Sequence, residues 1–278
     1  MQAKICFIGG GNMAKSLIAG MVNDDINVGN ITVIDRNEDK LTQLSQCFHV
    51  NVDTQMSSHL PRADIVLICV KPQSIDALMP EIKQALTARS PLIISIAAGV
   101  PIAQFESWLG QAHAIVRAMP NTPALIGAGA TAIVANAAVS RQQLEYAEMI
   151  FRKTGMVITL KDECLIDVVT ATSGSGPAYF FAMMEAMIQA AQTLGLEEKE
   201  ARLLVTQTAF GAAKMALESP MSIARLRNNV TSKGGVTAAA LLSLEASGFN
   251  GIIEKAMKAN MSRSGELARM FELSITKQ

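Results

Sequence analysis

Short apolar runs alternate with segments of helical periodicity through the first half of the chain. The runs cover residues 4–8, 31–34, 65–70 and 92–96. Each is followed by glycine, proline or polar residues, and the first two are followed by helical patterns over about residues 12–22 and from about Glu38. Continuous apolar runs of this length are typical of strands buried on both faces of a sheet. The alternation therefore predicts βαβ units and a parallel sheet.

A less regular segment follows. Residues 114–118 and 130–134 predict a further pair of strands. Ser140, with Gln143 three positions later, matches a capping box, in which side-chain and backbone groups satisfy each other at the start of a helix. That helix is expected to extend to about Lys153.

Helical periodicity dominates after a last predicted strand at residues 157–160. Helices are expected at about residues 165–172, 177–194, 197–217, 235–247 and 251–273. The length of 278 residues corresponds to roughly two domains of about 150 residues. We therefore predict an α/β domain over residues 1–160 and an all-α domain over residues 161–278.

The composition excludes two classes of protein. Lys+Arg and Asp+Glu number 24 each, so the net charge is zero, which excludes the strongly basic surface of a dedicated nucleic-acid-binding protein. The hydrophobic fraction of 50% excludes intrinsic disorder. Charged residues make up only 17% of the chain against about 25% in an average globular protein, so much of the surface carries no charge.

No metal site, disulfide framework or membrane span is expected. The four cysteines are widely spaced, without a Cys-x-x-Cys pair. No charge occurs between Arg117 and Arg141, but Pro120, Pro123 and Gly127 do not suit a membrane helix. The first apolar run is too short for a signal peptide. We predict a soluble, cytoplasmic protein with no membrane or nucleic-acid partner.

Gly9, Gly11 and Ala14 form a G-x-G-x-x-A motif between the first predicted strand and the first predicted helix. The first glycine permits a tight turn, the second lets a pyrophosphate approach the backbone, and the alanine allows close packing of helix on strand. The helix N-terminus, at Asn12 and Met13, supplies free N–H groups and a positive dipole for phosphates. The motif predicts a Rossmann-type doubly wound sheet that binds a dinucleotide.

Asp35 and Arg36 follow the second predicted strand, where the ribose of a dinucleotide is bound. An acidic residue there binds the 2′-hydroxyl of NAD, whereas an arginine meets the 2′-phosphate of NADP. The two residues are also typical of a solvent-exposed turn. They leave the cofactor open, slightly in favour of NADPH, with NADH as the other choice.

The residues that carry acid–base catalysis in common dehydrogenase classes are missing from the expected site. His49, His59 and His113 do not fall in a polar group at the carboxyl end of a predicted strand, so each is expected to be structural or exposed. Neither tyrosine is followed four positions later by lysine, as in short-chain dehydrogenases, and no set of zinc ligands occurs. These gaps indicate a hydride transfer that needs no strong acid–base residue.

Two uncharged polar segments interrupt the helical half. Residues 172–177 are expected to break one helix and begin another, with Pro177 at the first helical position. Residues 229–237 again lead into a helix. Such a loop at a helix N-terminus can hold a carboxylate through backbone N–H groups. Ordinary helix capping is the alternative.

Six motifs in order make the chain resemble the pyrroline-5-carboxylate reductase family, whose members make proline. They cover residues 7–14, 70–72, 95–100, 117–124, 173–179 and 229–237. The resemblance implies a Rossmann-type domain and an all-α C-terminal dimerisation domain, which interlocks in a homodimer and often builds higher assemblies. It also implies hydride transfer from NAD(P)H to 1-pyrroline-5-carboxylate, the last step of proline biosynthesis. This substrate is a cyclic imine, and its protonated form accepts hydride without a strong acid.

The resemblance also assigns roles to single residues. Thr237 corresponds to the hydroxyl that hydrogen-bonds the pyrroline nitrogen, and it is the candidate catalytic residue. The implied substrate-binding residues are Glu163, Asn229, Ser232, Gly234, Gly235 and Val236. Besides the glycine motif, Asp35 and Arg36, the implied cofactor-binding residues are Val70, Lys71, Pro72, Ala97 and Asn121.

Two positions depart from the family pattern. Lys233 stands where the family usually has proline, so the loop is expected to be less rigid, although the added cation suits a carboxylate. The family's cofactor-contacting asparagine has no clear counterpart near Met56, which leaves the contacts to adenosine open.

Two other functions stay open. One is a reductase of the same architecture that acts on a hydroxy acid or another imine, or that uses coenzyme F420. The other is a regulatory module that binds NADPH without turnover, for which Lys233 is the only hint. Eight methionines of the helical half are expected to contribute to a subunit interface: Met183, Met184, Met187, Met215, Met221, Met257, Met261 and Met270.

Overall fold

The computed structural model describes residues 2–22, 27–86 and 90–275, the last part of this range (residues 270–275) by its backbone alone. The chain forms two compact units. The sheet unit consists of Met1–Ser175 together with Ala259–Gln278, and the helical unit consists of Gly176–Lys258. These units divide the chain at other positions than the two predicted domains, whose boundary after residue 160 stays a prediction.

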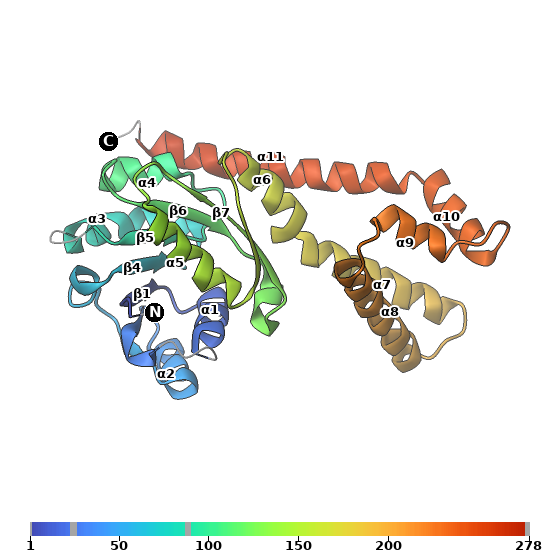
Figure 1. Cartoon of the computed structure of the whole chain (residues 1–278), viewed down its shortest axis with the longest axis horizontal. Coiled ribbons are helices and arrows are strands. Elements are labelled where there is room, and N and C mark those ends of the chain that lie inside the picture. The colour runs from blue at the N-terminus through green and yellow to red at the C-terminus, as the bar shows by residue number, and fades with distance from the viewer. Residues whose placement is uncertain (1, 23–26, 87–89, 276–278) are drawn as a thin grey trace. The chain divides into compact units, whose positions relative to one another are not determined.

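The sheet unit is built on eight strands in the order β3-β2-β1-β4-β5-β6-β7-β8 (Figure 1). The strands are β1 (Ile5–Ile8), β2 (Ile31–Ile34), β3 (Asn51–Asp53), β4 (Ile65–Ile68), β5 (Leu92–Ser95), β6 (Ile115–Met119), β7 (Gly129–Ala135) and β8 (Gly155–Thr159). Strands β1 to β6 are parallel wherever they pair. The order reverses between β1 and β4, which is the switch point at which doubly wound folds bind their ligands.

Helices cover both faces of this sheet. One face carries α1 (Asn12–Val22), α2 (Glu38–Phe48) and α5 (Arg141–Arg152), and the other carries α3 (Ile75–Ala85), α4 (Ile102–Leu109) and α6 (Leu165–Val169). Successive side chains of a strand point to opposite faces. Phe7 of β1 therefore packs with α1 and α2, while its neighbour Ile8 packs with α3. The predicted doubly wound fold is confirmed.

β6 and β7, the predicted strand pair at residues 114–118 and 130–134, depart from the parallel order of the sheet. β7 runs antiparallel to β6, and β8 runs parallel to β7. Parallel neighbours need a crossover of a dozen or more residues, usually a helix. The connection from β6 to β7 contains only the short helix η4 (Thr122–Ile126), which fits an antiparallel return.

The other predicted elements of the sheet unit agree with the structure within a few residues. The capping box is present: the Ser140 hydroxyl accepts from the Gln143 N–H, and the Gln143 side chain accepts from the Ser140 N–H. The pattern gives no individual prediction for β3, α3, α4 or α9. β3 has only three residues, all of them at least partly exposed, so it carries no apolar run.

The helical unit contains α7 (Gly176–Thr193), α8 (Glu198–Glu218), α9 (Ile223–Asn229), α10 (Val236–Ala246) and the first part of α11 (Phe249–Ile275). The predicted break at residues 172–177 is confirmed: a π-helical turn, η5 (Thr170–Gly174), separates α6 from α7, and α7 begins at Gly176, one residue before Pro177. Among the described residues, no single helix is long and apolar enough to cross a membrane. α10 and α11 meet that length and composition only as a pair, bent by 50°.

Candidate functional site

A tight glycine turn connects β1 to α1. The Gly9 N–H donates to the Ile34 carbonyl at 2.7 Å, and Gly9 has a φ of +101°, which disfavours other residues. A Cβ at Gly9 would lie 2.8 Å from the Cys69 carbonyl oxygen, so the backbone of β1 approaches the end of β4 closely. A Cβ at Gly11, in contrast, would meet nothing within 4 Å. The open space at Gly11 lies at the N-terminus of α1, where a phosphate would bind.

Asp35 holds this turn to the end of β2. Its Oδ2 accepts from the Gly10 N–H at 2.8 Å, and its Oδ1 accepts from the Asn37 N–H at 2.9 Å. Lys40 Nζ lies 3.8 Å from Asp35 Oδ2. A carboxylate has about four acceptor positions, so Asp35 retains capacity for a hydroxyl. Arg36 is exposed and makes no ion pair with any described residue, which leaves its guanidinium available for a ligand.

The other residues with a predicted cofactor role lie at the same edge of the sheet. Val70, Lys71 and Pro72 follow β4, Ala97 follows β5, and Asn121 follows β6. Carboxyl ends of parallel strands meet at one edge, so the structure brings these five residues to the edge that holds the glycine turn. Their contacts with a cofactor stay predictions.

Neither the Cys69 thiol nor the pair of His59 and Asp53 is a candidate nucleophile or metal ligand set. Burial raises the pKa of the Cys69 thiol well above its ordinary value, so the thiol is uncharged at neutral pH. His59 Nε2 lies 2.8 Å from Asp53 Oδ2, and this hydrogen bond lowers the pKa of the Asp53 carboxyl. No group of three or more residues suited to a metal occurs among the described residues.

The His59–Asp53 pair corrects one expectation. Asp53 is the last residue of β3, so His59 does belong to a polar group at the carboxyl end of a strand. The sequence pattern misses this pair because it does not predict β3. The pair lies beyond β2, on the adenosine side of a nucleotide bound in the usual manner of the fold.

Glu163 lies in a network around a buried arginine rather than alone. Its Oε1 accepts from Arg117 Nη1 and from the Ile102 N–H, each at 2.8 Å. Ile102 is the first residue of α4, and that N–H has no partner within its own helix. Arg117, in the middle of β6, is 5% exposed. Glu163 therefore caps α4 and neutralises a buried cation, while its predicted role toward a substrate stays a prediction.

A second carboxylate links this network to the C-terminal helix. Asp167 Oδ1 lies 3.6 Å from Arg117 Nη2 and accepts from the buried Ser264 hydroxyl at 2.8 Å. Close by, a Cβ at Gly99 would lie 3.0 Å from Leu267 Cβ, so α11 lies against the loop that follows β5. Both contacts fall within the sheet unit.

The predicted substrate loop lies in the helical unit, between α9 and α10. Gly234 has a φ of +71°, and the Gly235 N–H donates to the Ser232 carbonyl at 3.0 Å. Val236 and Thr237 are the first two residues of α10, which has no side-chain cap. The Thr237 hydroxyl has no hydrogen bond to any described residue. Asn229, the last residue of α9, donates to Met221 Sδ at 3.4 Å.

The loop thus presents free N–H groups and a free hydroxyl at a helix N-terminus, which is the arrangement needed to hold a carboxylate. The structure brings the predicted substrate residues Asn229, Ser232, Gly234, Gly235, Val236 and Thr237 together in this loop. Glu163 belongs to the other unit.

Known proteins resemble the chain over nearly its whole length. Residues 163–267 match the family described as pyrroline-5-carboxylate reductase dimerisation, and residues 4–99 match the family described as NADP oxidoreductase coenzyme F420-dependent. A pyrroline-5-carboxylate reductase of Pseudomonas aeruginosa is 44% identical, covering 95% of this chain and 97% of the relative. The chain belongs to the pyrroline-5-carboxylate reductase family.

Solved structures of family members share the fold. A pyrroline-5-carboxylate reductase from Coxiella burnetii has a TM-score of 0.91 at 41% identity, covering 96% of this chain and 99% of that chain. A Plasmodium falciparum pyrroline carboxylate reductase with NADP bound has a TM-score of 0.85 at 31% identity, with the same coverage of both chains. The fold predicted from the resemblance, a Rossmann-type domain with a helical dimerisation region, is confirmed.

The sequence of this family member does not predict the network of Arg117, Asp167 and Ser264. One signal for it was present. Arg117 interrupts the apolar run Ile115–Met119, and an arginine inside a buried strand requires a partner with opposite charge. The identity of the partner was not predictable, because Glu163 and Asp167 lie more than 40 positions away in the sequence.

We expect Gly11→Ala to weaken NADPH binding without loss of stability. The added methyl group meets no protein atom within 4 Å, so the melting temperature should stay that of the wild type. The methyl group would occupy the space in which a phosphate approaches the backbone. Titration of NADPH by fluorescence should show at least a tenfold weaker Kd, the equivalent of about 1.4 kcal/mol. Gly9→Ala is the contrasting variant: its clash with Cys69 should lower the melting temperature as well. Tight NADPH binding by Gly11→Ala would remove this turn from the cofactor site.

Proposed function

We propose that the chain reduces 1-pyrroline-5-carboxylate to L-proline with NADPH, as the last step of proline biosynthesis. The observation that carries the proposal is the substrate loop: a free hydroxyl at Thr237 beside uncapped N–H groups at the start of α10. Membership of the family supports it, and so does the dinucleotide turn with its open space at Gly11.

The residues of the sheet unit fit a dinucleotide. The turn Gly9–Gly11 and the N-terminus of α1 would hold the pyrophosphate, and Asp35 and Arg36 would hold the ribose with its 2′-phosphate. The bound cofactor supplies the hydride. The NADP-bound family member from Plasmodium falciparum supports this choice of cofactor.

The substrate loop supplies positioning and polarisation. The Thr237 hydroxyl donates to the ring nitrogen or accepts from its proton, which fixes the orientation of the imine. The N–H groups of Val236 and Thr237 and the exposed ammonium of Lys233 attract the substrate carboxylate. Protonation already makes the imine electrophilic, so no strong acid is required in the chain.

One assay tests the function. Purified protein is mixed with reduced nicotinamide cofactor and 1-pyrroline-5-carboxylate, and the loss of cofactor absorbance is followed together with the formation of proline. Consumption of cofactor with equal formation of proline supports the proposal. NADPH binding without turnover would support a regulatory module instead, and turnover only with hydroxy-acid or other imine substrates would assign the chain to a related reductase.

Arg36 is expected to favour NADPH over NADH. Arg36 is exposed and makes no ion pair with the described residues, so its guanidinium can pair with a 2′-phosphate without first breaking an existing contact. Arg36→Ala should raise KM for NADPH about tenfold, the loss of about 1.4 kcal/mol, and leave KM for NADH unchanged. Lys40→Ala is a matched control, since Lys40 already pairs with Asp35. A stronger preference for NADPH in Arg36→Ala would contradict this role.

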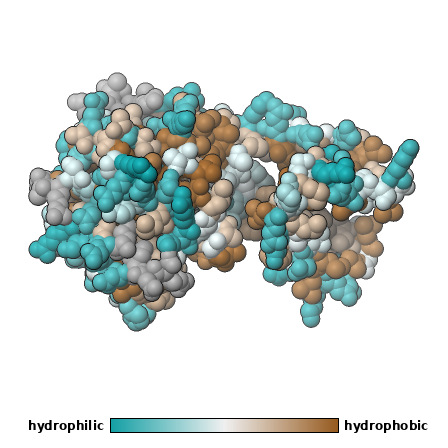
Figure 2. Space-filling model, viewed as in Figure 1, coloured by the Kyte–Doolittle hydropathy of each residue, from teal (hydrophilic) through white to brown (hydrophobic). Residues whose placement is uncertain are grey.

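We infer a homodimer, which further assembly then extends. The helical unit exposes large apolar side chains (Figure 2). Several are more than half exposed, among them Phe180, Phe181, Leu203, Phe210, Leu217 and Val236. Of the predicted interface methionines, Met183, Met187, Met215, Met221 and Met261 are exposed, Met184 and Met257 are partly buried, and Met270 lies outside the described side chains. Such exposure is far beyond what a monomer's surface usually carries.

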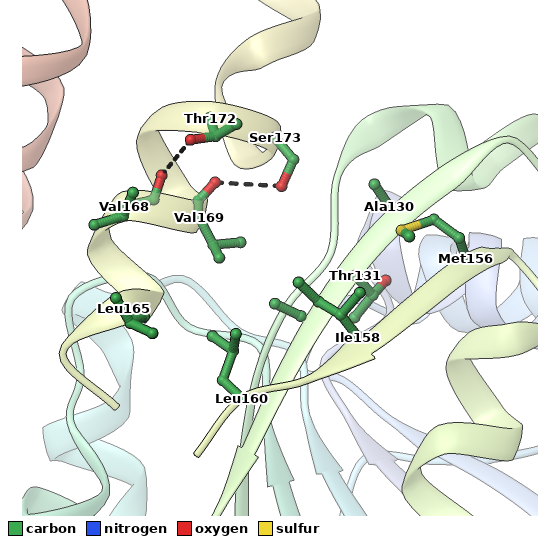
Figure 3. A pocket seen from close by; sticks show the side chains of 11 residues that line it. Ala130, Thr131, Met156, Ile158, Leu160, Leu165, Val168, Val169, Thr172 and Ser173 are labelled. Atoms are coloured by element: carbon green, nitrogen blue, oxygen red, sulfur yellow. Dashed lines mark hydrogen bonds between the residues drawn. The ribbon is translucent and has the colours of Figure 1, made fainter. Parts of the chain in front are cut away.

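The sheet unit adds a second apolar surface (Figure 3). Met156 and Ile158 of β8 face Leu165 and Val168 of α6 across a hollow of about 360 Å³. α6 lies within residues 163–267, the part of the chain that matches the dimerisation family, and this continuity supports a dimer that covers the hollow. Sedimentation equilibrium measures the mass directly, and a monomer at micromolar concentration would contradict the inference.

We also propose a cytoplasmic location. All four cysteines are free, and Cys47 and Cys164 are exposed. Free exposed thiols suit a reducing compartment. Fractionation of the source cells with detection of the protein in each fraction tests this location.

A further inference from the structure

The π-helical turn η5 leaves one carbonyl without its usual partner. In an α-helix the Ser173 carbonyl would accept from the N–H four residues on, but residue 177 is proline and has none. A proline ring also crowds the carbonyl four residues before it. The turn widens accordingly, and the Ser175 N–H donates five residues back, to the Thr170 carbonyl at 2.8 Å.

Asn121 supplies the missing donor. Its Nδ2 donates to the Ser173 carbonyl at 3.0 Å, and its Oδ1 accepts from the Ala130 N–H at 2.9 Å. The Asn121 side chain is 8% exposed, so both hydrogen bonds are shielded from water. Met119, two residues earlier, packs on the same turn, since a Cβ at Gly174 would lie 3.3 Å from Met119 Sδ. One carboxamide thus connects the end of β6, the start of β7 and the π-helical turn.

These contacts place Asn121 between the proposed cofactor edge and the polar segment that precedes α7. It lies at the carboxyl edge of the sheet, with the glycine turn and Ala97. Ser173–Ser175, which it holds, is the uncharged polar segment that leads into α7. We propose that Asn121 is a positioning residue: it fixes the π-helical turn against the cofactor edge of the sheet by giving Ser173 the hydrogen bond that Pro177 cannot. Its kinetic effect rests on the proposed function, whereas its effect on the turn does not.

This role differs from the cofactor contact predicted for Asn121. The two polar atoms of the side chain already have protein partners, and little of the side chain is accessible. A cofactor contact would make NADPH affinity depend on the side chain. A positioning role instead predicts intact NADPH affinity and altered turnover of the imine.

Asn121→Asp separates the two roles. A carboxylate still accepts from the Ala130 N–H but cannot donate to Ser173, and a buried carbonyl left unpaired costs about 1–3 kcal/mol. If the transition state loses this free energy, kcat/KM for 1-pyrroline-5-carboxylate should fall about tenfold to 100-fold. The Kd for NADPH should stay that of the wild type. Hydrogen exchange by mass spectrometry should become faster in peptides that cover residues 170–176.

Pro177→Ala provides the matched rescue. An alanine at this position restores a main-chain N–H four residues after Ser173. In Asn121→Asp/Pro177→Ala the slow exchange of residues 170–176 and most of the lost kcat/KM should return, while Pro177→Ala alone should resemble the wild type. A double variant no better than Asn121→Asp would overturn the donor argument.

Three other results would also overturn the inference. Wild-type exchange and wild-type kinetics in Asn121→Asp would show that the hydrogen bond positions nothing. A raised Kd for NADPH with unchanged imine kinetics would return Asn121 to the cofactor site. A lower melting temperature with unchanged kinetics and NADPH affinity would show a merely structural role. If the wild type itself turns over no imine, the proposed function fails, and the exchange measurements still decide whether Asn121 holds the turn.

Discussion

Thr237→Val is expected to lower kcat/KM for 1-pyrroline-5-carboxylate about 100-fold, as removal of an oriented donor does in other enzymes. Valine has nearly the shape of threonine and is likewise branched at Cβ. The Thr237 hydroxyl makes no hydrogen bond to any described residue, so its loss breaks no described contact within the chain. The melting temperature should therefore stay that of the wild type, and steady-state absorbance kinetics measure the effect on catalysis.

Thr237→Ser is the control, because it keeps the hydroxyl and removes only the methyl group. It should retain most of the wild-type kcat/KM. Whether Thr237→Val changes kcat or KM is informative as well. A fall in kcat shows that the hydroxyl acts mainly in the transition state. A rise in KM alone shows that it binds the substrate and the transition state equally. Turnover like that of the wild type in Thr237→Val would remove this residue from the mechanism.

The repeating elements of the fold are local in origin, which is why the sequence predicts them. The glycine turn, the strand before it and the helix after it follow from residues 4–22, and the capping box at Ser140 is complete within four residues. The direction of β7 depends on how the chain returns after β6, and an apolar run carries no information on direction. The π-helical turn is a similar case, since Pro177 marks the irregularity but does not say which donor replaces its own.

The candidate site also has a part that the sequence predicts and a part that it does not. The cofactor edge is predictable, because parallel strands necessarily bring their carboxyl ends together. Arg117, Glu163, Asp167 and Ser264 come from three distant parts of the sequence, and only the folded chain shows that they meet. Asn121 is similar: its place at the edge follows from the strand pattern, but its partner Ser173 does not.

Arg117→Met is expected to give the largest loss of stability among the charged residues considered. Removing one member of a buried ion pair costs about 3–5 kcal/mol, because the remaining charge stays without compensation. Here the remaining charges are the carboxylates of Glu163 and Asp167, whose side chains are 28% and 33% exposed, so water screens them in part. We therefore expect the free energy of unfolding to fall by about 2–4 kcal/mol, somewhat less than for a fully buried pair. Urea denaturation followed by circular dichroism measures it.

A matched variant separates burial from charge. Arg141 pairs with Glu145 on the surface of α5, and its side chain is 94% exposed. Arg141→Met makes the same chemical change, but an exposed pair contributes only about 0.2–1 kcal/mol, so the free energy of unfolding should change little.

Adding Glu163→Gln and Asp167→Asn to Arg117→Met removes the uncompensated charges and should recover part of the lost stability, because the amides still accept from the Ile102 N–H and the Ser264 hydroxyl. Equal losses for Arg117→Met and Arg141→Met would mean that β6, α4, α6 and α11 do not depend on this network. A loss confined to Arg117→Met, and partly reversed in the triple variant, would show that the buried cation joins the C-terminal helix to the sheet.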